Sequence, residues 1–354
     1  MTVRVGFLGA GNIARYHARM VGDAIGSDGI DARIVAVHDP ADDGRSDRFV
    51  DDTGAEAVGS VDELVRRSDA VYVCTWTATH RQLVGAAVAD GRAVFCEKPL
   101  DVDLATSQLV RDLLVDSGVT HQVGLVLRRS PAFNVLRERV VDAEAGAPMA
   151  VLFRDDQYLP TQGAYASTWR GDRVLAGSGV LMEHSIHDID LLEWMLGPIV
   201  RVHATTAGHH EIVGIEDVAT VSLQFASGVS GALITVWHDV LSRPSQRLVE
   251  VISRRRVSHL DGEWTGTVRW QDAEGGGELI DDELLQHARL HHPEAANPDR
   301  AFLEAVAAGR PSSPDADDAL RAHVVLDAAY RSAATGLPVD VGPTSSVREP
   351  SSDR

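Results

Sequence analysis

The first third of the chain alternates short apolar runs with stretches whose apolar residues recur at helical spacing. Five runs are typical of buried strands: Val3–Leu8, Arg33–His38, Ala70–Cys74, Ala93–Cys96 and Gln122–Leu127. Helices are expected between them at Ile13–Ile25, at His80–Ala89 before Gly91, and at Leu104–Ser117 before Gly118. This order predicts βαβ units, with a parallel sheet covered by helices on both faces.

The second half of the chain changes to a period of two. Val218–Phe225 alternates strictly, and Gly228 then leads into a second alternating run, Val229–His238. Leu248–Ile252 and Thr267–Trp270 continue this pattern. It predicts an open, mainly antiparallel sheet with one face to cover, either by helices of the chain or by a second subunit. Late helices are expected at Asp299–Ala308 and Asp317–Ala334.

These two patterns predict an α/β fold in two domains. The first domain is expected over residues 1–127 and the second, an α+β domain, over residues 128–342. The polar, Pro- and Ser-rich tail, residues 343–354, is expected to be disordered.

The charge of the chain narrows the choice of partners. Lysine and arginine number 33 against 52 acidic residues, a formal net charge of −19, so nucleic acid and anionic membranes are poor partners. Cys74 and Cys96 both lie in apolar runs, which does not indicate a disulfide framework. Because neither a spanning stretch of about 18 apolar residues nor a secretion signal is evident, a cytoplasmic protein is expected.

A glycine-rich motif follows the first strand, where a helix must begin: Gly9-Ala10-Gly11-Asn12-Ile13-Ala14. In such a G-x-G-x-x-G/A pattern Gly9 permits a tight turn, Gly11 lets a pyrophosphate approach the backbone, and Ala14 allows close packing of helix and strand. The first N–H groups of the helix favour phosphate. An ordinary glycine-rich turn is the alternative interpretation.

Asp39 strengthens the nucleotide interpretation because it ends the second predicted strand. A carboxylate there can accept hydrogen bonds from both ribose hydroxyls and repels a 2′-phosphate, so NAD is expected rather than NADP. Arg45 and Arg48 are near enough in sequence to moderate that preference. The interval from Gly11 to Asp39 is longer than usual, and Gly22–Gly29 is interpreted as an inserted loop that accounts for it.

Two more strand ends carry polar residues where ligands of open α/β sheets bind. Thr75-Trp76-Thr77-Ala78-Thr79-His80 follows one strand, and Glu97-Lys98-Pro99 follows the next. Lys98 near a nicotinamide could have its pKa lowered by burial and positive neighbours. The alternative is a surface lysine paired with Glu97.

The segment from Gly177 to Asp190, GSGVLMEHSIHDID, carries the third signal. Interpreted as one helix, it places Glu183 and His187 four residues apart on one face, an arrangement suited to acid–base chemistry. A metal cluster is an alternative, but the spacing lacks the H-E-x-x-H pattern of zinc helices and no metal is expected. His184 could be a hydrogen-bonded core residue, and the pairs His209-His210 and His291-His292 are interpreted as surface residues.

The order of these motifs resembles the glucose-fructose oxidoreductase, inositol dehydrogenase and MocA family over essentially the whole chain to Val341. The resemblance implies a Rossmann domain followed by a domain whose open sheet makes subunit contacts, here a homodimer or homotetramer. It implies that Lys98, Glu183 and His187 surround the substrate carbon. Residues expected to bind the cofactor are Gly9, Gly11, Asn12, Ile13, Asp39, Thr75, Trp76, His80, Glu97, Lys98, Trp169 and Arg170.

The sequence also departs from the family pattern. Many relatives carry Asp where this chain has Glu183 and a glycine-rich turn where it has His184-Ser185. Where relatives often have Thr-Pro-Asn, this chain has Thr75-Trp76-Thr77, which would place a flat apolar wall near the nicotinamide. These departures bear on the identity of the substrate more than on the type of reaction.

The expected activity is hydride transfer between NAD and a secondary alcohol of a sugar, cyclitol or related polyol. His187 would be the general base, oriented through Glu183, and Lys98 would stabilise the alkoxide. Arg128, Tyr158, His184 and His238 are further substrate candidates. Two alternatives stay open: a redox-neutral glycosidase that holds NAD, and an NAD-binding sensor without catalysis.

Overall fold

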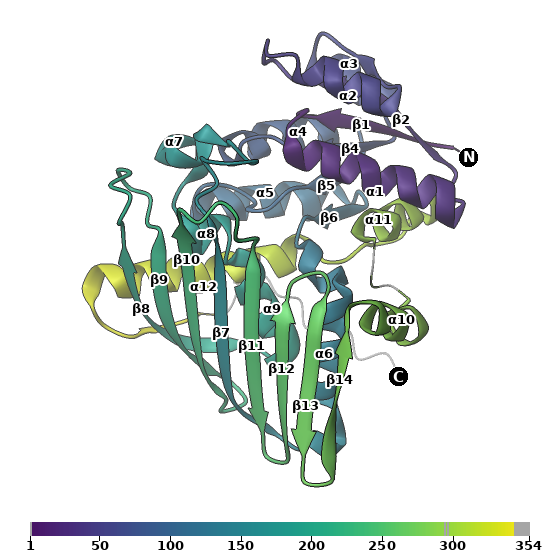
Figure 1. Cartoon of the computed structure of the whole chain (residues 1–354). Coiled ribbons are helices and arrows are strands. Elements are labelled where there is room, and N and C mark those ends of the chain that lie inside the picture. The colour runs from purple at the N-terminus through teal and green to yellow at the C-terminus, as the bar shows by residue number, and fades with distance from the viewer. Residues whose placement is uncertain (1, 294, 296, 343–354) are drawn as a thin grey trace.

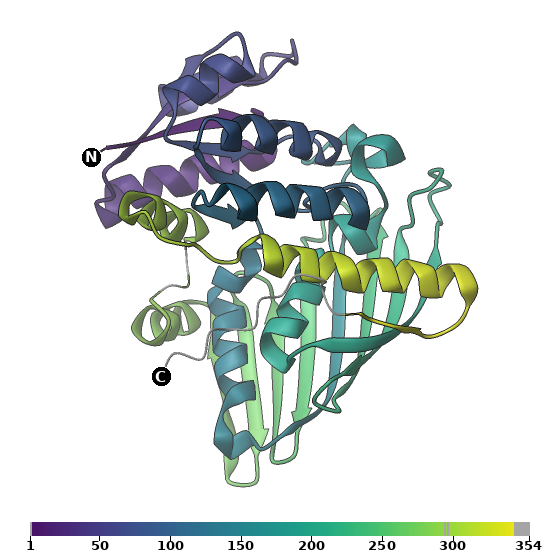
Figure 2. The same ribbon diagram turned by 180° about the vertical axis from the view of Figure 1, so that it is seen from behind.

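A computed structural model of the chain describes residues 2–293, 295 and 297–342. The predicted disordered tail, residues 343–354, lies outside the described residues. Figures 1 and 2 show two sheets, one above the other, with the last long helix crossing between them.

The first sheet has six parallel strands in the order β3-β2-β1-β4-β5-β6, which is the order of a dinucleotide-binding Rossmann fold. Its strands are β1 Val3–Leu8, β2 Ala32–His38, β3 Glu56–Ala57, β4 Ala70–Val73, β5 Ala93–Cys96 and β6 His121–Val123. The helices between them are α1 Asn12–Asp28, α2 Arg45–Thr53, α3 Val61–Arg67, α4 His80–Ala89 and α5 Leu104–Ser117, with the short 3₁₀ helix η1 Thr77–Thr79. The predicted parallel sheet is confirmed.

Two details of this domain differ from the sequence prediction. The inserted loop at Gly22–Gly29 is wrong, because α1 continues to Asp28 and ends at Gly29, whose φ is +70°. Val21 and Ala24 are fully buried, and their packing keeps these turns helical despite the glycines. The strand at Gln122–Leu127 ends at Val123, and Val126–Arg129 forms the 3₁₀ helix η2, since burial of an apolar run does not by itself make it extended.

The second sheet has nine strands in the order β14-β13-β12-β11-β7-β10-β9-β8-β15. Of the strand pairs in the described part of this sheet, only β7 and β10 pair in parallel, so the sheet is open and mainly antiparallel, as predicted. Its strands are β7 Pro148–Tyr158, β8 Ile199–Ala207, β9 Val218–Phe225, β10 Ser230–His238, β11 Gln246–Ser253, β12 Arg256–Gly262, β13 Gly266–Asp272, β14 Gly275–Ile280 and β15 Val339–Asp340. The remaining elements are α6 Pro131–Val141, η3 Ala143–Ala145, η4 Thr168–Gly171, α7 Arg173–Ala176, α8 Val180–Glu183, α9 Ile186–Leu196, α10 Asp281–His291, α11 Pro298–Ala308 and α12 Ala316–Thr335.

Helices α6, α9 and α12 cover one face of the second sheet, which is the near side in Figure 2. Val151, Phe153 and Leu233 point into this covered face and are at most 2% exposed. The opposite face, turned toward the viewer in Figure 1, carries Leu152 at 54% and Ile234 at 43% exposure. Among the residues that the structure describes, helices therefore cover only one of the two faces of this sheet.

The last helices connect the two sheets. Phe302 and Leu303 of α11 are buried in the core of the first domain, where Phe302 packs edge-on against Tyr72 and Phe95. α12 contacts α5 on one side and β8 on the other. The segment assigned to the second domain by its position in the sequence thus returns to pack on the first. In the described part of the chain, no helix is both long and apolar enough to cross a bilayer.

Candidate active site

The glycine-rich turn joins β1 to α1 at the carboxyl end of the first sheet. Gly9 has a φ of +97°, and a Cβ atom there would lie 2.3 Å from the Cys74 carbonyl oxygen, so only glycine fits. At Gly11 a Cβ atom would meet nothing within 4 Å, and no side chain caps α1. Uncapped N–H groups beside open space are what a pyrophosphate requires, so the turn fits a dinucleotide.

Asp39 follows β2 and faces the same turn. Its two carboxylate oxygens accept hydrogen bonds from the backbone N–H groups of Ala10 and Ala41, each at 2.9 Å. A carboxylate has about four acceptor positions, so both oxygens keep capacity for the ribose hydroxyls. Arg45 Nη1 lies 3.8 Å from Asp39, but its guanidinium donates to Asp43. The arrangement fits NAD.

Lys98 leaves β5 and extends toward the second domain. Its Nζ donates a hydrogen bond of 2.5 Å to the backbone carbonyl of Glu183. Burial lowers the pKa of Lys98, and the positive charges of Arg170 and Arg247 add to this against the opposing effect of Glu183. The ammonium keeps further N–H groups for a ligand, since it has three donors.

The carboxylate of Glu183 is held by two residues that sequence reasoning did not pair with it. Thr77 Oγ1 donates to Oε1 and Arg170 Nε donates to Oε2, both at 3.0 Å. Glu183 does not share a helix with His187, because α8 ends at Glu183 and α9 begins at Ile186. The predicted single helix is therefore wrong, and the orientation of His187 through Glu183 is not seen among the hydrogen bonds of the described residues.

His187 lies in the first turn of α9 and is 8% exposed. Its Nδ1 atom is buried and has no hydrogen-bond partner among the described residues. Burial lowers the pKa of His187 well below its usual value, and the charges of Lys98 and Arg247 act in the same direction. The ring is thus neutral and has unmet hydrogen-bonding capacity close to Lys98.

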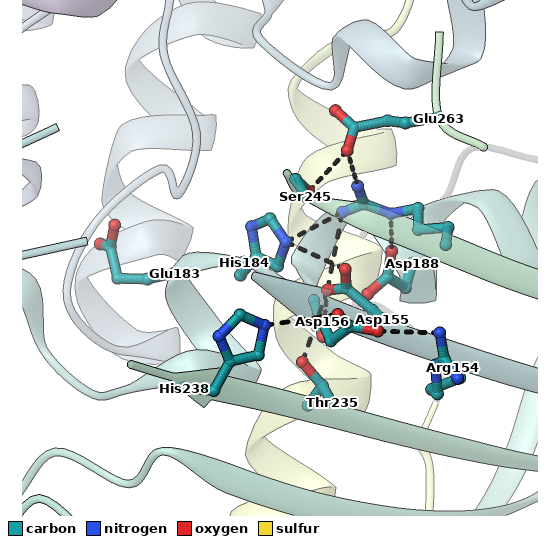
Figure 3. A network of polar contacts seen from close by, with 12 residues as sticks. Arg154, Asp155, Asp156, Glu183, His184, Asp188, Thr235, His238, Ser245 and Glu263 are labelled. Carbon is teal, nitrogen blue, oxygen red and sulfur yellow. Dashed lines mark hydrogen bonds and ion pairs between the residues drawn. The ribbon is translucent and has the colours of Figure 1, made fainter. Parts of the chain in front are cut away.

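A buried polar network lies behind these groups, and Figure 3 shows it beside the separate Glu183. Arg247 of β11 is 1% exposed and donates to Asp188 Oδ1 and Glu263 Oε2, both at 2.7 Å. Its Nη2 lies 3.7 Å from Asp155 Oδ2. Burial raises the pKa of Asp188 to about 7 although Arg247 opposes this. One guanidinium therefore compensates three carboxylates beneath the site.

His184 belongs to this network and is not free for a substrate in the described structure. Its Nε2 lies 3.0 Å from Asp155 Oδ1 and 3.5 Å from Arg247 Nη2. Burial and the charge of Arg247 lower the pKa of His184 to about 3, so the ring is neutral. The interpretation of His184 as a hydrogen-bonded core residue is the one this geometry supports.

His80 and Glu97, both expected to bind the cofactor, make hydrogen bonds to neighbouring parts of the chain. His80 is 1% exposed, with Nδ1 2.9 Å from the Pro99 carbonyl and Nε2 3.4 Å from the Thr75 carbonyl. Glu97 Oε1 lies 2.9 Å from Nε2 of His17, a buried residue of α1. The side chains of His80 and Glu97 therefore both make hydrogen bonds within the protein, near the loop that carries Lys98.

Other expected residues line the approach to the turn. Trp76 is 44% exposed beside Thr75, whose hydroxyl bonds to Thr79. Trp169 stacks on the guanidinium of Arg170, with 4.5 Å from Cζ to the ring centroid. This places an indole next to the group that holds Glu183.

Loop residues from the second domain reach the glycine-rich turn. Asn12 Nδ2 donates to the Tyr165 carbonyl at 3.0 Å, and the Tyr165 ring stacks on Tyr158 at 5.1 Å. His238, at the end of β10, lies 3.4 Å from Asp156 Oδ2 (Figure 3) and its Nδ1 accepts from the Val240 N–H. Tyr158 and His238 therefore sit at the same end of the sheet as Asp155.

Arg128 belongs to a different group of contacts. Its guanidinium binds both oxygens of Asp190, at 2.8 and 2.6 Å, and lies 3.1 Å from Asp318. It also lines a cavity between α6, α9 and the segment at Ser313. These ion pairs support a structural salt bridge at Arg128 rather than the substrate contact that the sequence suggested.

Sequence reasoning missed Thr77, Asp155, Arg247 and Glu263 as parts of the site. Asp155 stands inside a strand, and a charged residue at a covered strand position is a signal that could have been used. Arg247 lies 59 residues from Asp188 and 16 residues from Glu263 in the sequence, so no local pattern connects the three side chains.

Comparison with known proteins agrees with this geometry. Residues 3–125 match an oxidoreductase family with an NAD-binding Rossmann fold, and residues 133–255 match the GFO/IDH/MocA C-terminal domain. An inositol 2-dehydrogenase of Rhizobium meliloti (strain 1021) is 31% identical over 344 residues, 94% of this chain and 98% of that protein. The scyllo-inositol 2-dehydrogenase (NAD(+)) of Bacillus subtilis (strain 168) is 28% identical over 65% of this chain and 66% of its own length.

Solved structures share the same fold. A putative myo-inositol dehydrogenase from Sinorhizobium meliloti 1021 has a TM-score of 0.75 and 26% identity, covering 96% of this chain and all of that one. An NAD-binding oxidoreductase from Klebsiella pneumoniae has a TM-score of 0.84 at 20% identity, covering 97% of this chain and all of that one. The chain therefore belongs to the Gfo/Idh/MocA family of NAD-binding oxidoreductases, as its motifs predict.

Proposed function

We propose that this oxidoreductase is a cyclitol dehydrogenase that oxidises a ring secondary alcohol of an inositol or a closely related polyol. The observation that carries the proposal is the position of Lys98, whose Nζ donates to the Glu183 carbonyl and whose charge acts on the neutral ring of His187. The likeness to inositol 2-dehydrogenases over nearly the whole chain supports the substrate class.

Each side chain has a separate task in this proposal. Bound NAD supplies the hydride acceptor. Lys98 donates a hydrogen bond to the reacting hydroxyl oxygen and stabilises the negative charge that develops there. His187 takes the hydroxyl proton on its neutral imidazole, because only the unprotonated ring has a nitrogen lone pair that can accept it. Glu183, held by Thr77 and Arg170, positions the loop whose carbonyl fixes the ammonium.

The cofactor is held by the first domain. The N–H groups at Gly11 to Ile13 would bind the pyrophosphate, and Asp39 would accept from the adenosine ribose hydroxyls. Thr75 and Trp76 lie at the next strand end, toward the nicotinamide half. Tyr158, Trp169 and His238 are the candidates for further contacts with a polyol.

A substrate panel tests the function directly. We expect NADH formation with at least one of myo-inositol, scyllo-inositol, their epimers or the aminocyclitols, and much less with NADP in place of NAD. Simple glycosides serve as the contrast. Release of free sugar without net NADH would instead indicate the redox-neutral glycosidase, and no turnover across the panel despite NAD binding would indicate a sensor.

We also infer that two copies pair through the open face of the second sheet. Leu152 and Ile234 are large apolar side chains exposed on neighbouring strands of that face. Exposed apolar patches of this kind mark interaction sites. Size-exclusion chromatography with light scattering is expected to give a dimer or tetramer, and the double variant Leu152→Glu, Ile234→Glu to give a smaller species.

We also expect this protein to be located in the cytoplasm. The chain is strongly acidic and its two cysteines, Cys74 and Cys96, are free and buried. Thiols of this kind suit a reducing compartment. Fractionation of the source cells should recover the NAD-linked activity in the soluble fraction.

A further inference from the structure

Three metal-ligating side chains meet at the junction of α6 and α10, outside the candidate active site. Glu138 comes from α6, His287 from α10, and His292 from the residue just after α10. The Nε2 atoms of both histidines lie 2.8 Å from the same Glu138 oxygen, Oε2. The possible ligand atoms of the three residues all lie within 4.8 Å of one another.

The three side chains are partly buried and still reach solvent. Glu138 is 31% exposed, and the rings of His287 and His292 are 19% and 18% exposed. Burial raises the pKa of Glu138, but the hydrogen bonds from the two histidines outweigh it and the net shift is downward. The partial exposure of all three side chains leaves room for an ion to reach them from solvent.

A cavity of about 360 Å³ opens beside the cluster, and Glu138 and His292 form part of its wall. The wall also includes Arg128, Arg129, Arg137 and Trp194. The cavity gives an ion and a small ligand a path to the cluster, which a proposed metal site needs.

We propose that Glu138, His287 and His292 bind one divalent transition metal ion, best matched by zinc, with a fourth coordination position that faces the arginine-lined cavity. Two imidazoles and one carboxylate are a common set of three protein ligands for zinc, and the fourth position of such sites holds water or a ligand. Imidazole also suits copper and nickel, whereas magnesium and calcium prefer oxygen.

The geometry asks for only a small rearrangement. With bonds of about 2.0–2.2 Å, ligand atoms of a tetrahedral zinc site lie roughly 3.4 Å apart. The two Nε2 atoms at 2.8 Å from Oε2 would each have to move outward by about 0.6 Å. Each histidine now points Nε2 at a carboxylate oxygen, and metal binding replaces these two N–H hydrogen bonds with metal–nitrogen bonds.

The cavity suggests what completes the coordination. Arg137 donates from Nε to the Trp194 carbonyl and stacks over the Trp194 ring, with 4.6 Å from Cζ to the centroid. Arg128 and Arg129 line the same cavity, so its wall carries three guanidinium groups although the net charge of the chain is −19. An oxyanion such as a carboxylate or phosphate can therefore bind the metal and an arginine together.

Titration of the purified full-length protein tests the site. After treatment with a chelator and its removal, isothermal titration with zinc chloride at pH 7.5 is expected to show one site per chain, and cobalt(II) to give the visible absorption of four-coordinate cobalt. Zinc should also raise the melting temperature, since it binds only the folded arrangement.

Matched variants distinguish zinc binding by these three residues from nonspecific zinc binding by surface histidines. His287→Ala and His292→Ala should each lower zinc affinity by at least tenfold, and Glu138→Gln should do so without removing a histidine. His291→Ala is the control: His291 is exposed and its ring lies tilted beside that of His287, with centroids 4.4 Å apart, but it is not one of the three converging residues. It should leave affinity within about threefold of the parent.

Three results would overturn the proposal. They are the absence of zinc binding, equal loss of affinity in His291→Ala and His292→Ala, and weak adventitious binding by several sites. Zinc binding and cobalt absorption are read without NAD or substrate, so failure of the proposed dehydrogenase activity would leave this test intact.

Discussion

Lys98 donates its hydrogen bond to the backbone carbonyl of Glu183 and not to the Glu183 carboxylate. That carboxylate faces Thr77 and Arg170 instead. The ammonium is thus positioned by a neutral group while Arg170 and Arg247 act with burial to lower its pKa. Its charge is free to act on a substrate oxygen.

Replacing this ammonium should abolish most of the turnover. For Lys98→Ala we expect kcat to fall by about 100-fold or more, the range for loss of a group that stabilises charge in the transition state. NAD affinity, measured by isothermal titration, should change little because the glycine-rich turn and Asp39 are untouched. Turnover within a few-fold of the parent would remove Lys98 from the mechanism.

Lys98 is also the only lysine among the 354 residues, which permits a chemical test. Because its pKa is lowered, an acetylating reagent should modify it at mildly alkaline pH, with the chain's amino terminus as the only other amine. Loss of activity should follow acetylation of the peptide that contains Lys98, as read by mass spectrometry. Saturating NAD together with a polyol should slow both the acetylation of Lys98 and the loss of activity. If activity were lost when only the amino terminus is acetylated, the position of Lys98 in the active site would be contradicted.

Cofactor choice should depend on Asp39. Removing its charge in Asp39→Ser deletes the acceptor for the ribose hydroxyls, and a charge-assisted hydrogen bond is worth about 1.5–3 kcal/mol. We expect kcat/KM for NAD to fall by roughly 10–100-fold. The ratio of NADP to NAD use should rise, since the carboxylate that would repel a 2′-phosphate is gone, while Arg45 stays near the site, held by Asp43. Steady-state kinetics with both cofactors measure this, and an unchanged ratio would contradict it.

The buried network should make stability depend on Arg247 and on pH. In Arg247→Met, Asp155, Asp188 and Glu263 lose the guanidinium that compensates them, a loss of about 3–5 kcal/mol for a broken buried pair. Burial already raises the pKa of Asp155 and Asp188, and loss of the guanidinium raises both pKa values further above the unfolded values, so stability falls as pH increases. The deficit against the parent in urea unfolding should be larger at pH 8 than at pH 5.5. An equal deficit at both would show that lost packing dominates.

Elements whose ends are marked by a local sequence signal were predicted correctly. The ends of β1, β5, α5 and β9 were predicted to the residue, because glycine caps and strict periodicity mark them. β7 was missed although it has 11 residues, since Arg154, Asp155 and Asp156 interrupt its alternation. β8 was missed because a bulge between Ile199 and Arg201 shifts its period.

The sequence predicted which residues form the candidate site better than it predicted how they contact one another. Lys98, Glu183 and His187 were named from their motifs, but the break between α8 and α9 gave Glu183 partners other than His187. That break follows from contacts across the sheet, where His184 and Ser185 both turn toward Asp155 of β7. Partners supplied by a distant strand leave no mark on local spacing.

His17 gives the last prediction, because it joins α1 to the loop of Lys98 through two buried carboxylates. Nδ1 lies 2.9 Å from Asp299 and Nε2 lies 2.9 Å from Glu97. Burial lowers the pKa of His17, but these two carboxylates outweigh it and raise the pKa to about 10. Because this folded value lies above the unfolded value of about 6.5, the stabilisation is complete below pH 6.5 and is lost as pH rises through 10.

Unfolding experiments across that window test the role of His17. The free energy of unfolding of the parent should decline between pH 7 and pH 10, and His17→Phe should lack this part of the decline while losing about 3–5 kcal/mol at pH 7. His203→Phe, an exposed histidine on β8, is the control and should follow the parent. If His17→Phe kept the pH dependence of the parent, the imidazole would be uncharged, and the link from α1 to Glu97 would rest on neutral hydrogen bonds alone.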